Sequence, residues 1–373
     1  STHFTSKELS GTNLQSFRPP RTLPNNNNKQ TIKKMAPPHI LIVGAGSMGV
    51  FLGHYLHLSG AQITFLVRPH RVESLSKPQV IYSYHTHKTQ TFKDFGIISN
   101  LNDVAKASYD FVIVALDGHH VATTDGLATL KSIGDAVRDK STPIIAGSVG
   151  NNTVSHYAKA TGLPEHRIIQ SVLWTLVHEV GAANLPVHPP TDAKLLATSD
   201  YAFHLITDAS FYILSNKETD DIKRFVALYG ASGATKCDIS PPTHFLLNVN
   251  PSFAFLIGWG VQGWKPATEL ADDKETWKLT VDAVKEIQGL EEFGELGKAA
   301  QAATTPEGFL AGQISYSQSV LPLDYAAFNK YHHGGKVRVQ DVEKLDGMVA
   351  QLDLEGKPTT ALKTLISRFK ALY

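Results

Sequence analysis

The sequence predicts a two-part α/β architecture, in which a doubly wound parallel sheet is followed by a C-terminal all-helical domain. Two observations carry this prediction. Up to about residue 240, short apolar runs typical of buried strands alternate with stretches of helical spacing. From Thr243 onward the apolar spacing is helical and strand patterns are scarce. Alternating strands and helices favour a parallel sheet covered on both faces, and the helical remainder indicates a second domain.

A glycine-rich stretch opens the first domain. The apolar run from Ile40 to Val43 reads as a buried strand, and Gly44, Gly46 and Gly49 follow it with the spacing G-x-G-x-x-G. In a dinucleotide site the first glycine permits a tight turn, the second lets the backbone approach the pyrophosphate, and the third lets helix and strand pack closely. The N-terminus of the following helix offers free N–H groups to the phosphates. We therefore predict a Rossmann domain whose cofactor-binding loop comprises Gly44, Ala45, Gly46, Ser47, Met48 and Gly49.

The end of the second predicted strand indicates which dinucleotide is bound. The strand covers residues 62–67, and Arg68 and Arg71 follow it where an NAD site usually places an acidic residue. A guanidinium group suits the 2′-phosphate of NADP(H). The predicted cofactor is therefore NADP(H) rather than NAD(H).

Two further strands should deliver loops to the same crevice. Residues 110–116 and 142–146 are buried-strand patterns, and the loops after them begin at Asp117 and Gly147. Ligands of open α/β sheets bind at the carboxyl ends of the strands, so we expect Gly147 beside the cofactor. Additional strands are expected within 80–98 and 168–214, and helices at 102–108 and 219–229.

The chain divides into three parts. Residues 1–37 are predicted to be a disordered extension, since the first 34 are rich in Asn, Ser and basic residues and lack apolar periodicity. An upstream extension is favoured there over a transit peptide. Residues 38–240 form the NADP-binding domain. Residues 241–373 form a helical substrate and dimerisation domain, with helices expected at 243–258, 275–290, 307–320 and 337–372.

Composition narrows the function classes. Of the 373 residues 42% are hydrophobic and 18% charged, and the net charge of +1 gives no case for a nucleic-acid or membrane partner. The single cysteine, Cys237, excludes an intramolecular disulfide and a multi-cysteine metal site. No metal site is predicted, and a cytoplasmic location is expected.

The glycine motif, Arg68, the helical second half and the closing stretches Gln340-Asp341, Gly356-Lys-Pro and Ala361-Leu-Lys together resemble the ketopantoate reductase family. This resemblance implies a C-terminal helical domain like that of 6-phosphogluconate dehydrogenase and an active site between the domains. It also implies reduction of a 2-oxo acid by NADPH and pairing of two chains into a homodimer.

Several positions depart from the family pattern. Asp117 stands where the family commonly has a lysine. At the start of the second domain, His244 replaces the family's catalytic lysine and Asn248 follows four residues later. An aspartate in a former lysine position suits a small anionic keto acid less well. A larger or less charged ketone, or an imine, is therefore an equally good expectation.

The proton donor should be a group that titrates near neutral pH. His244 meets this need, with Asn248 on the same helix face to orient substrate or cofactor. His332 and His333 could also approach the site, because the glycines at 334 and 335 allow close backbone contact. The remaining candidates for substrate contact are Asp117, His120, Asn250 and Lys336.

The sequence thus predicts an NADPH-dependent reductase of a 2-oxo acid or related ketone. Two alternatives stay open. One is an imine reductase of the same superfamily, and the other is a catalytically inactive protein that senses NADP(H).

Overall fold

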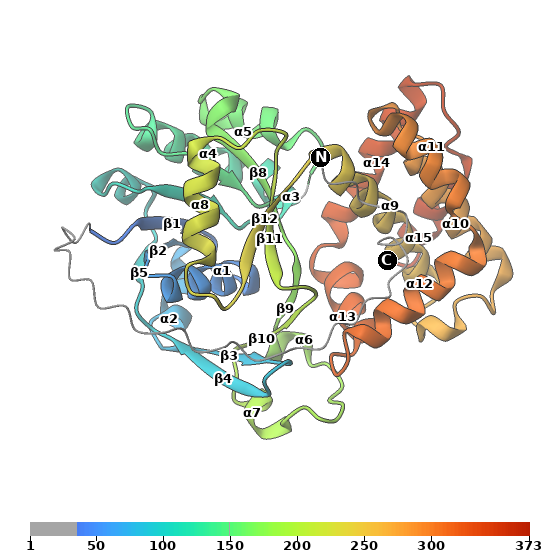
Figure 1. The fold of residues 1–373 in the computed structure, drawn as a ribbon, viewed down its shortest axis with the longest axis horizontal. Coiled ribbons are helices and arrows are strands. Elements are labelled where there is room, and N and C mark those ends of the chain that lie inside the picture. Colours follow the sequence, from blue (N-terminus) through green and yellow to red (C-terminus); the bar gives the residue numbers. More distant parts are fainter. Residues whose placement is uncertain (1–35, 149) are drawn as a thin grey trace, which may run out of the picture.

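The computed structural model describes residues 36–148 and 150–373, so the prediction for residues 1–35 lies outside the described residues. A region of sheets and a region of helices lie side by side in Figure 1, with the helices from residue 242 onward drawn in yellow-brown to red. The predicted combination of a parallel-strand sheet with a helical C-terminal region is confirmed.

The main sheet has eight strands in the order β12-β11-β8-β7-β6-β1-β2-β5. From β5 to β8 every neighbouring pair is parallel, while β11 is antiparallel to β8. The six parallel strands follow the Rossmann order 3-2-1-4-5-6, with the reversal of strand order between β1 and β6. The strands are β1 (His39–Val43), β2 (Gln62–Leu66), β5 (Gly96–Ile98), β6 (Phe111–Val114), β7 (Ile144–Ala146), β8 (Ile168–Leu173), β11 (Ala209–Leu214) and β12 (Lys236–Ser240).

Helices cover both faces of this sheet. Ile40 and Ile42 on β1 pack in one apolar cluster with α1 (Ser47–Leu58) and α8 (Asp220–Gly230). Leu41 and Val43 pack in another with α4 (Thr124–Val137) and α5 (Thr153–Thr161). Successive side chains of a strand point to opposite faces, which explains why the uninterrupted apolar run of β1 is buried on both sides.

A second, four-stranded sheet has the order β4-β3-β10-β9. It joins the hairpin of β3 (Gln79–Ser83) and β4 (Lys88–Phe92) to β10 (Tyr201–Leu205) and β9 (Thr175–Glu179). Both stretches that the sequence indicated as strand-rich therefore contribute to this sheet. The expected helix at 102–108 is instead a 3-10 helix, η2 (Leu101–Lys106).

The helical region surrounds its own apolar core. It contains α9 (Pro242–Val261), α10 (Lys274–Gln288), α11 (Gly294–Ala303), α12 (Pro306–Ser319), α13 (Tyr325–Tyr331), a π-helical turn η6 (His332–Lys336), α14 (Arg338–Leu354) and α15 (Thr360–Lys370). The predicted helix over 337–372 was wrong as one element. The chain turns at Gly356, whose φ of 64° is a left-handed conformation that favours glycine. The helices α11 and α13 were not predicted.

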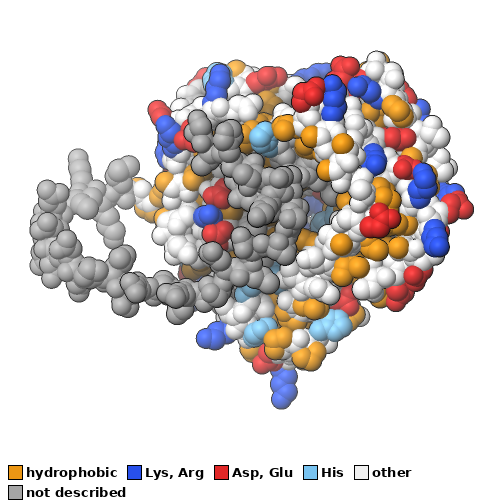
Figure 2. All heavy atoms as spheres, turned by 45° about the vertical axis from the view of Figure 1, so that its right-hand side comes forward, with side chains coloured by type: hydrophobic (Ala, Val, Ile, Leu, Met, Phe, Trp, Pro, Cys, Tyr) orange, Lys and Arg blue, Asp and Glu red, His pale blue; other side chains and the backbone are white. Residues whose placement is uncertain are grey.

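Basic and acidic side chains are interspersed on the face of the molecule shown in Figure 2. Within the part of the chain that the structure describes, no helix is long and apolar enough to cross a bilayer.

Candidate active site

A cavity of about 2500 Å³ lies between the main sheet and the helical region. Its sheet side includes the loops that follow β1, β2, β6 and β7 and residues 172–177 of β8 and β9. Its other side comes from α9, α12, α13, η6 and α14. These loops stand at the carboxyl ends of parallel strands, where open α/β sheets bind their ligands.

The three motif glycines each meet a different steric requirement. Gly44 has a φ of 94°, and its N–H donates to Leu66 O over 2.9 Å, which fixes the turn after β1. A Cβ at Gly49 would overlap Gly44 O, so a side chain there would separate α1 from the strand. A Cβ at Gly46 would meet nothing within 4 Å, and Gly46 lines the cavity. The loop therefore leaves an open cradle at the N-terminus of α1, which fits a dinucleotide pyrophosphate.

The two predicted arginines have different surroundings. Both line the cavity. Arg68 is exposed just after β2, with its guanidinium open to a ligand. Arg71 is half-buried, and its Nη2 donates to Ala45 O over 3.2 Å and to Tyr201 Oη over 3.4 Å. Arg71 therefore braces the glycine-rich loop, whereas Arg68 is an exposed cation at the cavity.

On the helical side, Lys336 reaches across the cavity to the glycine-rich loop. Its Nζ donates to Ser47 Oγ over 3.2 Å. Burial lowers the pKa of Lys336, and the nearby carboxylates of Glu179 and Asp117 oppose this by favouring the ammonium form. The ammonium group is thus a cation held between the main sheet and the helical region, with anionic groups near it.

The π-helical turn η6 presents Lys336. The turn carries Gly334, at which a Cβ would lie 3.0 Å from Trp264 Nε1, so only glycine packs there without displacing the indole. His332 and His333 of this turn also line the cavity. Single π-helical turns are frequent at functional sites.

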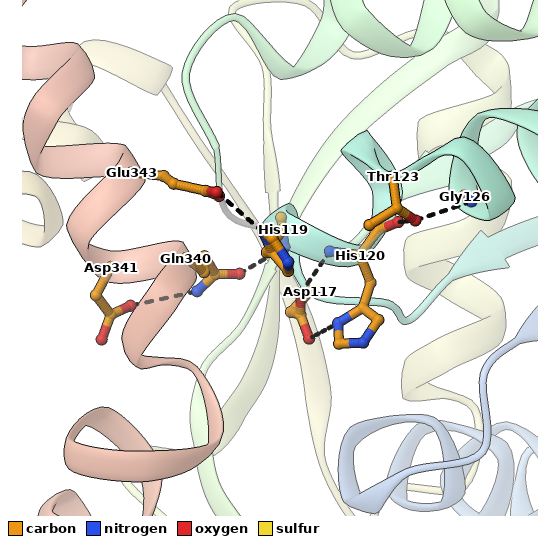
Figure 3. Close-up of polar contacts among 9 residues, drawn as sticks. Asp117, His119, His120, Thr123, Gly126, Gln340, Asp341 and Glu343 are labelled. Atoms are coloured by element: carbon orange, nitrogen blue, oxygen red, sulfur yellow. Dashed lines mark hydrogen bonds and ion pairs between the residues drawn. The ribbon is translucent and has the colours of Figure 1, made fainter. Parts of the chain in front are cut away.

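Asp117 lies at the N-terminus of the short helix α3 (Gly118–Ala122), directly after β6 (Figure 3). Its Oδ1 accepts from His120 N over 2.8 Å, and its Oδ2 pairs with His120 Nδ1 at 2.7 Å. Both oxygens are therefore used within α3, although Asp117 and His120 line the cavity. Gly147 lines it as well, and a Cβ there would lie 2.7 Å from Val114 O.

The predicted residues of α9 are not all brought together. Asn248 lines the cavity, and its Nδ2 donates to His244 O over 3.1 Å. His244 is exposed and does not line the cavity. Asn250 is buried away from it. The arrangement therefore does not support His244 as a group that reaches a ligand in the cavity, and its role stays a prediction.

One ion pair at the cavity was not predicted. His333 Nδ1 lies 2.7 Å from Asp341 Oδ2, and the side chains are 18% and 1% exposed. The residues are eight positions apart, a spacing that would separate them by about 12 Å along a regular helix. The π-helical turn and the bend at Val337 bring them together. The only sequence signal was the pair of glycines beside His333.

Residues 40–189 match the family described as "Ketopantoate reductase PanE/ApbA". The matched region covers less than half of the chain. The predicted resemblance is confirmed, and the matched region contains the glycine-rich loop, Arg68 and both Asp117 and Gly147. A comparison with curated proteins finds no match.

Solved structures support the same fold over most of the chain. A PanE/ApbA family ketopantoate reductase from Ralstonia eutropha JMP134 is 14% identical, with a TM-score of 0.63, covering 89% of this chain and 97% of its own. D-mandelate dehydrogenase in complex with NADH is 15% identical, with a TM-score of 0.60 and coverages of 89% and 98%. The dimeric ketopantoate reductase from Staphylococcus aureus is 13% identical, with a TM-score of 0.53 and coverages of 89% and 98%. At identities this low, the comparison shows that the fold is shared.

Proposed function

We propose that the protein is an NADP(H)-dependent reductase that converts the carbonyl group of a 2-oxo acid or related ketone into an alcohol. The observation that carries this proposal is the contact between Lys336 Nζ and Ser47 Oγ, because it sets a cation against the dinucleotide loop inside the cavity. The match of residues 40–189 to the ketopantoate reductase family supports the reaction class. The fold neighbours support it too, as they include ketopantoate reductases and a dehydrogenase with NADH.

The residues present fit a phosphorylated dinucleotide. The open face of Gly46 and the N-terminus of α1 would hold the pyrophosphate. Arg68 would hold the 2′-phosphate, while Arg71 keeps the loop in place through Ala45 O. When bound, the reduced nicotinamide supplies hydride for the carbonyl carbon.

The walls of the cavity indicate the substrate class. Ligand pockets commonly measure about 300–1,000 Å³, so about 2500 Å³ leaves room for a dinucleotide and a second molecule. Lys336 would bind an anionic end of that molecule and stabilise negative charge on the carbonyl oxygen. Aromatic side chains also line the cavity, which suits a substrate with a bulky apolar group; they include Trp174, Phe253, Phe309, Tyr316 and Phe328.

Binding and turnover test the proposal separately. The purified chain is titrated with NADPH and NADH, and binding is followed by fluorescence. The NADPH complex is then mixed with aliphatic and aryl 2-oxo acids, their methyl esters, neutral ketones and cyclic imines, and absorbance of the reduced nicotinamide is followed. We expect tighter binding of NADPH than of NADH, and turnover of 2-oxo acids or ketones with an apolar substituent.

The other outcomes decide between the remaining hypotheses. Turnover confined to cyclic imines would identify an imine reductase. Tight NADPH binding without turnover of any compound would favour a sensor. Absence of dinucleotide binding would contradict the proposal altogether.

Two expectations about the whole protein belong to the same proposal. We propose a homodimer, because one fold neighbour is a dimeric enzyme, and light scattering during size-exclusion chromatography measures the mass directly. We also propose a cytoplasmic location, which cell fractionation checks.

A further inference from the structure

We propose that His333, held by Asp341, is the proton donor of the reductase. This inference rests on the proposed function and names a catalytic residue for the same site. Asp341 acts as the positioning residue, since it contacts the imidazole and does not line the cavity.

The geometry of the pair is that of an oriented imidazole. His333 Nδ1 lies 2.7 Å from Asp341 Oδ2. An ionised carboxylate accepts hydrogen bonds and donates none, so Nδ1 carries a proton. The exchangeable proton is then the one on Nε2, at the other end of the ring. Because His333 lines the cavity while Asp341 is 1% exposed, the buried partner fixes the ring and the exposed edge serves the ligand.

A second hydrogen-bonded link joins the pair to the Rossmann domain. Gln340 Oε1 accepts from Gly118 N over 2.6 Å, and Gln340 Nε2 donates to Asp341 Oδ1 over 3.4 Å (Figure 3). Gly118 follows β6, which flanks the point where the strand order reverses. The link therefore places the pair at the edge of the sheet where a nicotinamide ring is expected. A contact between His119 Nδ1 and Glu343 Oε1 at 2.9 Å supports the same interface of α3 and α14.

The surroundings of the pair favour a fixed ring. Phe253 of α9 meets His333 edge to face, with ring centroids 6.4 Å apart. Lys344 of α14 is buried, and its Nζ lies 5.4 Å from the Phe253 ring centroid. Burial lowers the pKa of Lys344 to about 8, against the opposing influence of Glu292 and Asp341.

Other charged and titratable groups lie near the pair. Lys336 and His332 lie on its own turn, and His178 faces His332 from β9. Burial holds the pKa of His332 well below its ordinary value, so His332 is neutral and has no proton to give near pH 7. Lys336 is engaged with Ser47. His120 also lines the cavity and pairs with Asp117, but those two side chains are 50% and 24% exposed. His333 is therefore the cavity imidazole that is held by a buried carboxylate.

The proposed step transfers one hydride and one proton to the carbonyl group. The carbonyl carbon gains a hydride from the reduced dinucleotide, and the carbonyl oxygen gains the Nε2 proton of His333. The imidazolium becomes a neutral imidazole whose remaining proton stays on Nδ1, hydrogen-bonded to Asp341. A proton from solvent then reprotonates Nε2. The products are the alcohol and the oxidised dinucleotide.

Kinetics of two variants test the assignment. Loss of a general acid commonly costs about 10²- to 10⁴-fold in rate. We expect His333→Gln to lower kcat by about that factor, with the Kd of NADPH unchanged, and to remove the alkaline loss of rate that a titrating donor causes. Asp341→Asn should lower kcat with little change in KM. The matched control is His166→Gln, an exposed histidine of η3 (Glu165–Arg167) remote from the cavity.

A measurement on the protein without cofactor tests the pair itself. Nitrogen NMR of ¹⁵N-histidine-labelled protein should show a His333 ring protonated at Nδ1 with a downfield N–H signal. The signal is assigned by its absence in His333→Gln, and Asp341→Asn should remove the downfield shift. If Asp341→Asn does not fold, the kinetics of His333→Gln still test the proposal, because the His333 side chain borders the cavity and is less buried than Asp341.

The outcomes separate this inference from the proposed function. If wild type reduces substrate and His333→Gln has the same kcat, the role of His333 and Asp341 is overturned and the proposed function stands. If kcat falls in His244→Gln and not in His333→Gln, this inference is also overturned, and the result supports the prediction from sequence that His244 is the proton donor. A wild type that binds dinucleotide and reduces nothing overturns the function, whatever the NMR signal shows.

Discussion

Lys336 Nζ and Ser47 Oγ lie 3.2 Å apart, although 289 residues separate them in the sequence. The contact joins the π-helical turn of the helical region to the N-terminus of α1 in the Rossmann domain. It closes one side of the cavity and fixes a positive charge beside the cradle of Gly46. The site is thus completed by a residue from each end of the chain.

Lys336→Gln should lower kcat/KM more for anionic substrates than for neutral ones. A hydrogen bond to a charged group contributes about 1.5–3 kcal/mol, so we expect kcat/KM for a 2-oxo acid to fall about 10- to 100-fold. The methyl ester of the same acid lacks the charge and should lose less than about 3-fold. The control is Lys330→Gln, an exposed lysine of α13 outside the cavity lining. Equal losses for acid and ester would contradict this role.

The glycine-rich loop offers a matched pair of variants. Gly49→Ala places a Cβ onto Gly44 O, and overpacking of this kind costs about 1–3 kcal/mol. We expect Gly49→Ala to lower the free energy of unfolding by about that amount. Gly46→Ala meets nothing within 4 Å, so its stability should match wild type, while its Kd for NADPH rises at least about 10-fold. Denaturant unfolding and fluorescence titration of both variants check the contrast. Equal stability of the two proteins would argue against the close packing at Gly49.

The predicted and unpredicted parts of the fold differ in the range of the interactions that define them. The glycine loop, β1 and α1 were predictable because their requirements are local, as in the tight turn at Gly44. The second sheet was not, because it pairs β3 with β10, which lies more than a hundred residues further along the chain. Apolar alternation indicates a strand but not its partner.

The glycine-rich loop and Lys336 were predictable as parts of the cavity lining, whereas the orientation of the other candidate side chains was not. Asp117 lies at the expected crevice, but its carboxylate serves the N-terminus of α3. The spacing of His244 and Asn248 defined one helix face. The orientation of that face was not predictable, because α9 is apolar on most sides and its rotation is set by packing. The His333–Asp341 pair depends on a π-helical turn, for which the sequence has no periodic signal.

Arg68→Ala should change the choice of dinucleotide. The guanidinium is exposed at the end of β2, and the loss of one charged hydrogen-bonding group commonly costs about 1.5–3 kcal/mol. We expect the Kd for NADPH to rise about 10- to 100-fold while that for NADH stays within about 2-fold. Arg71→Ala is the comparison. It removes the hydrogen bond to Ala45 O and should weaken the binding of both dinucleotides to a similar extent. Fluorescence titrations with each dinucleotide measure all four values, and an unchanged NADPH affinity in Arg68→Ala would remove Arg68 from the 2′-phosphate site.

Buried histidines should make the protein less stable in mild acid. Burial lowers the pKa of His178 to about 4 from its ordinary 6.5, and its Nε2 pairs with Tyr84 Oη at 3.2 Å. Between these two values the unfolded chain binds a proton that the folded chain does not. The free energy of unfolding therefore falls as pH decreases from 6.5 to 4, by about 3 kcal/mol for this group. The pKa of His204 is also lowered to about 4 by burial, which adds a loss of the same sign.

Urea unfolding of His178→Gln across this range measures that contribution. Near pH 6.5 the variant should be less stable than wild type, because the buried contact with Tyr84 is altered. The difference should shrink by about 3 kcal/mol as pH approaches 4, since glutamine takes up no proton. His166→Gln changes an exposed histidine and should run parallel to wild type. A constant difference between His178→Gln and wild type would show that His178 is protonated equally in the folded and unfolded chains.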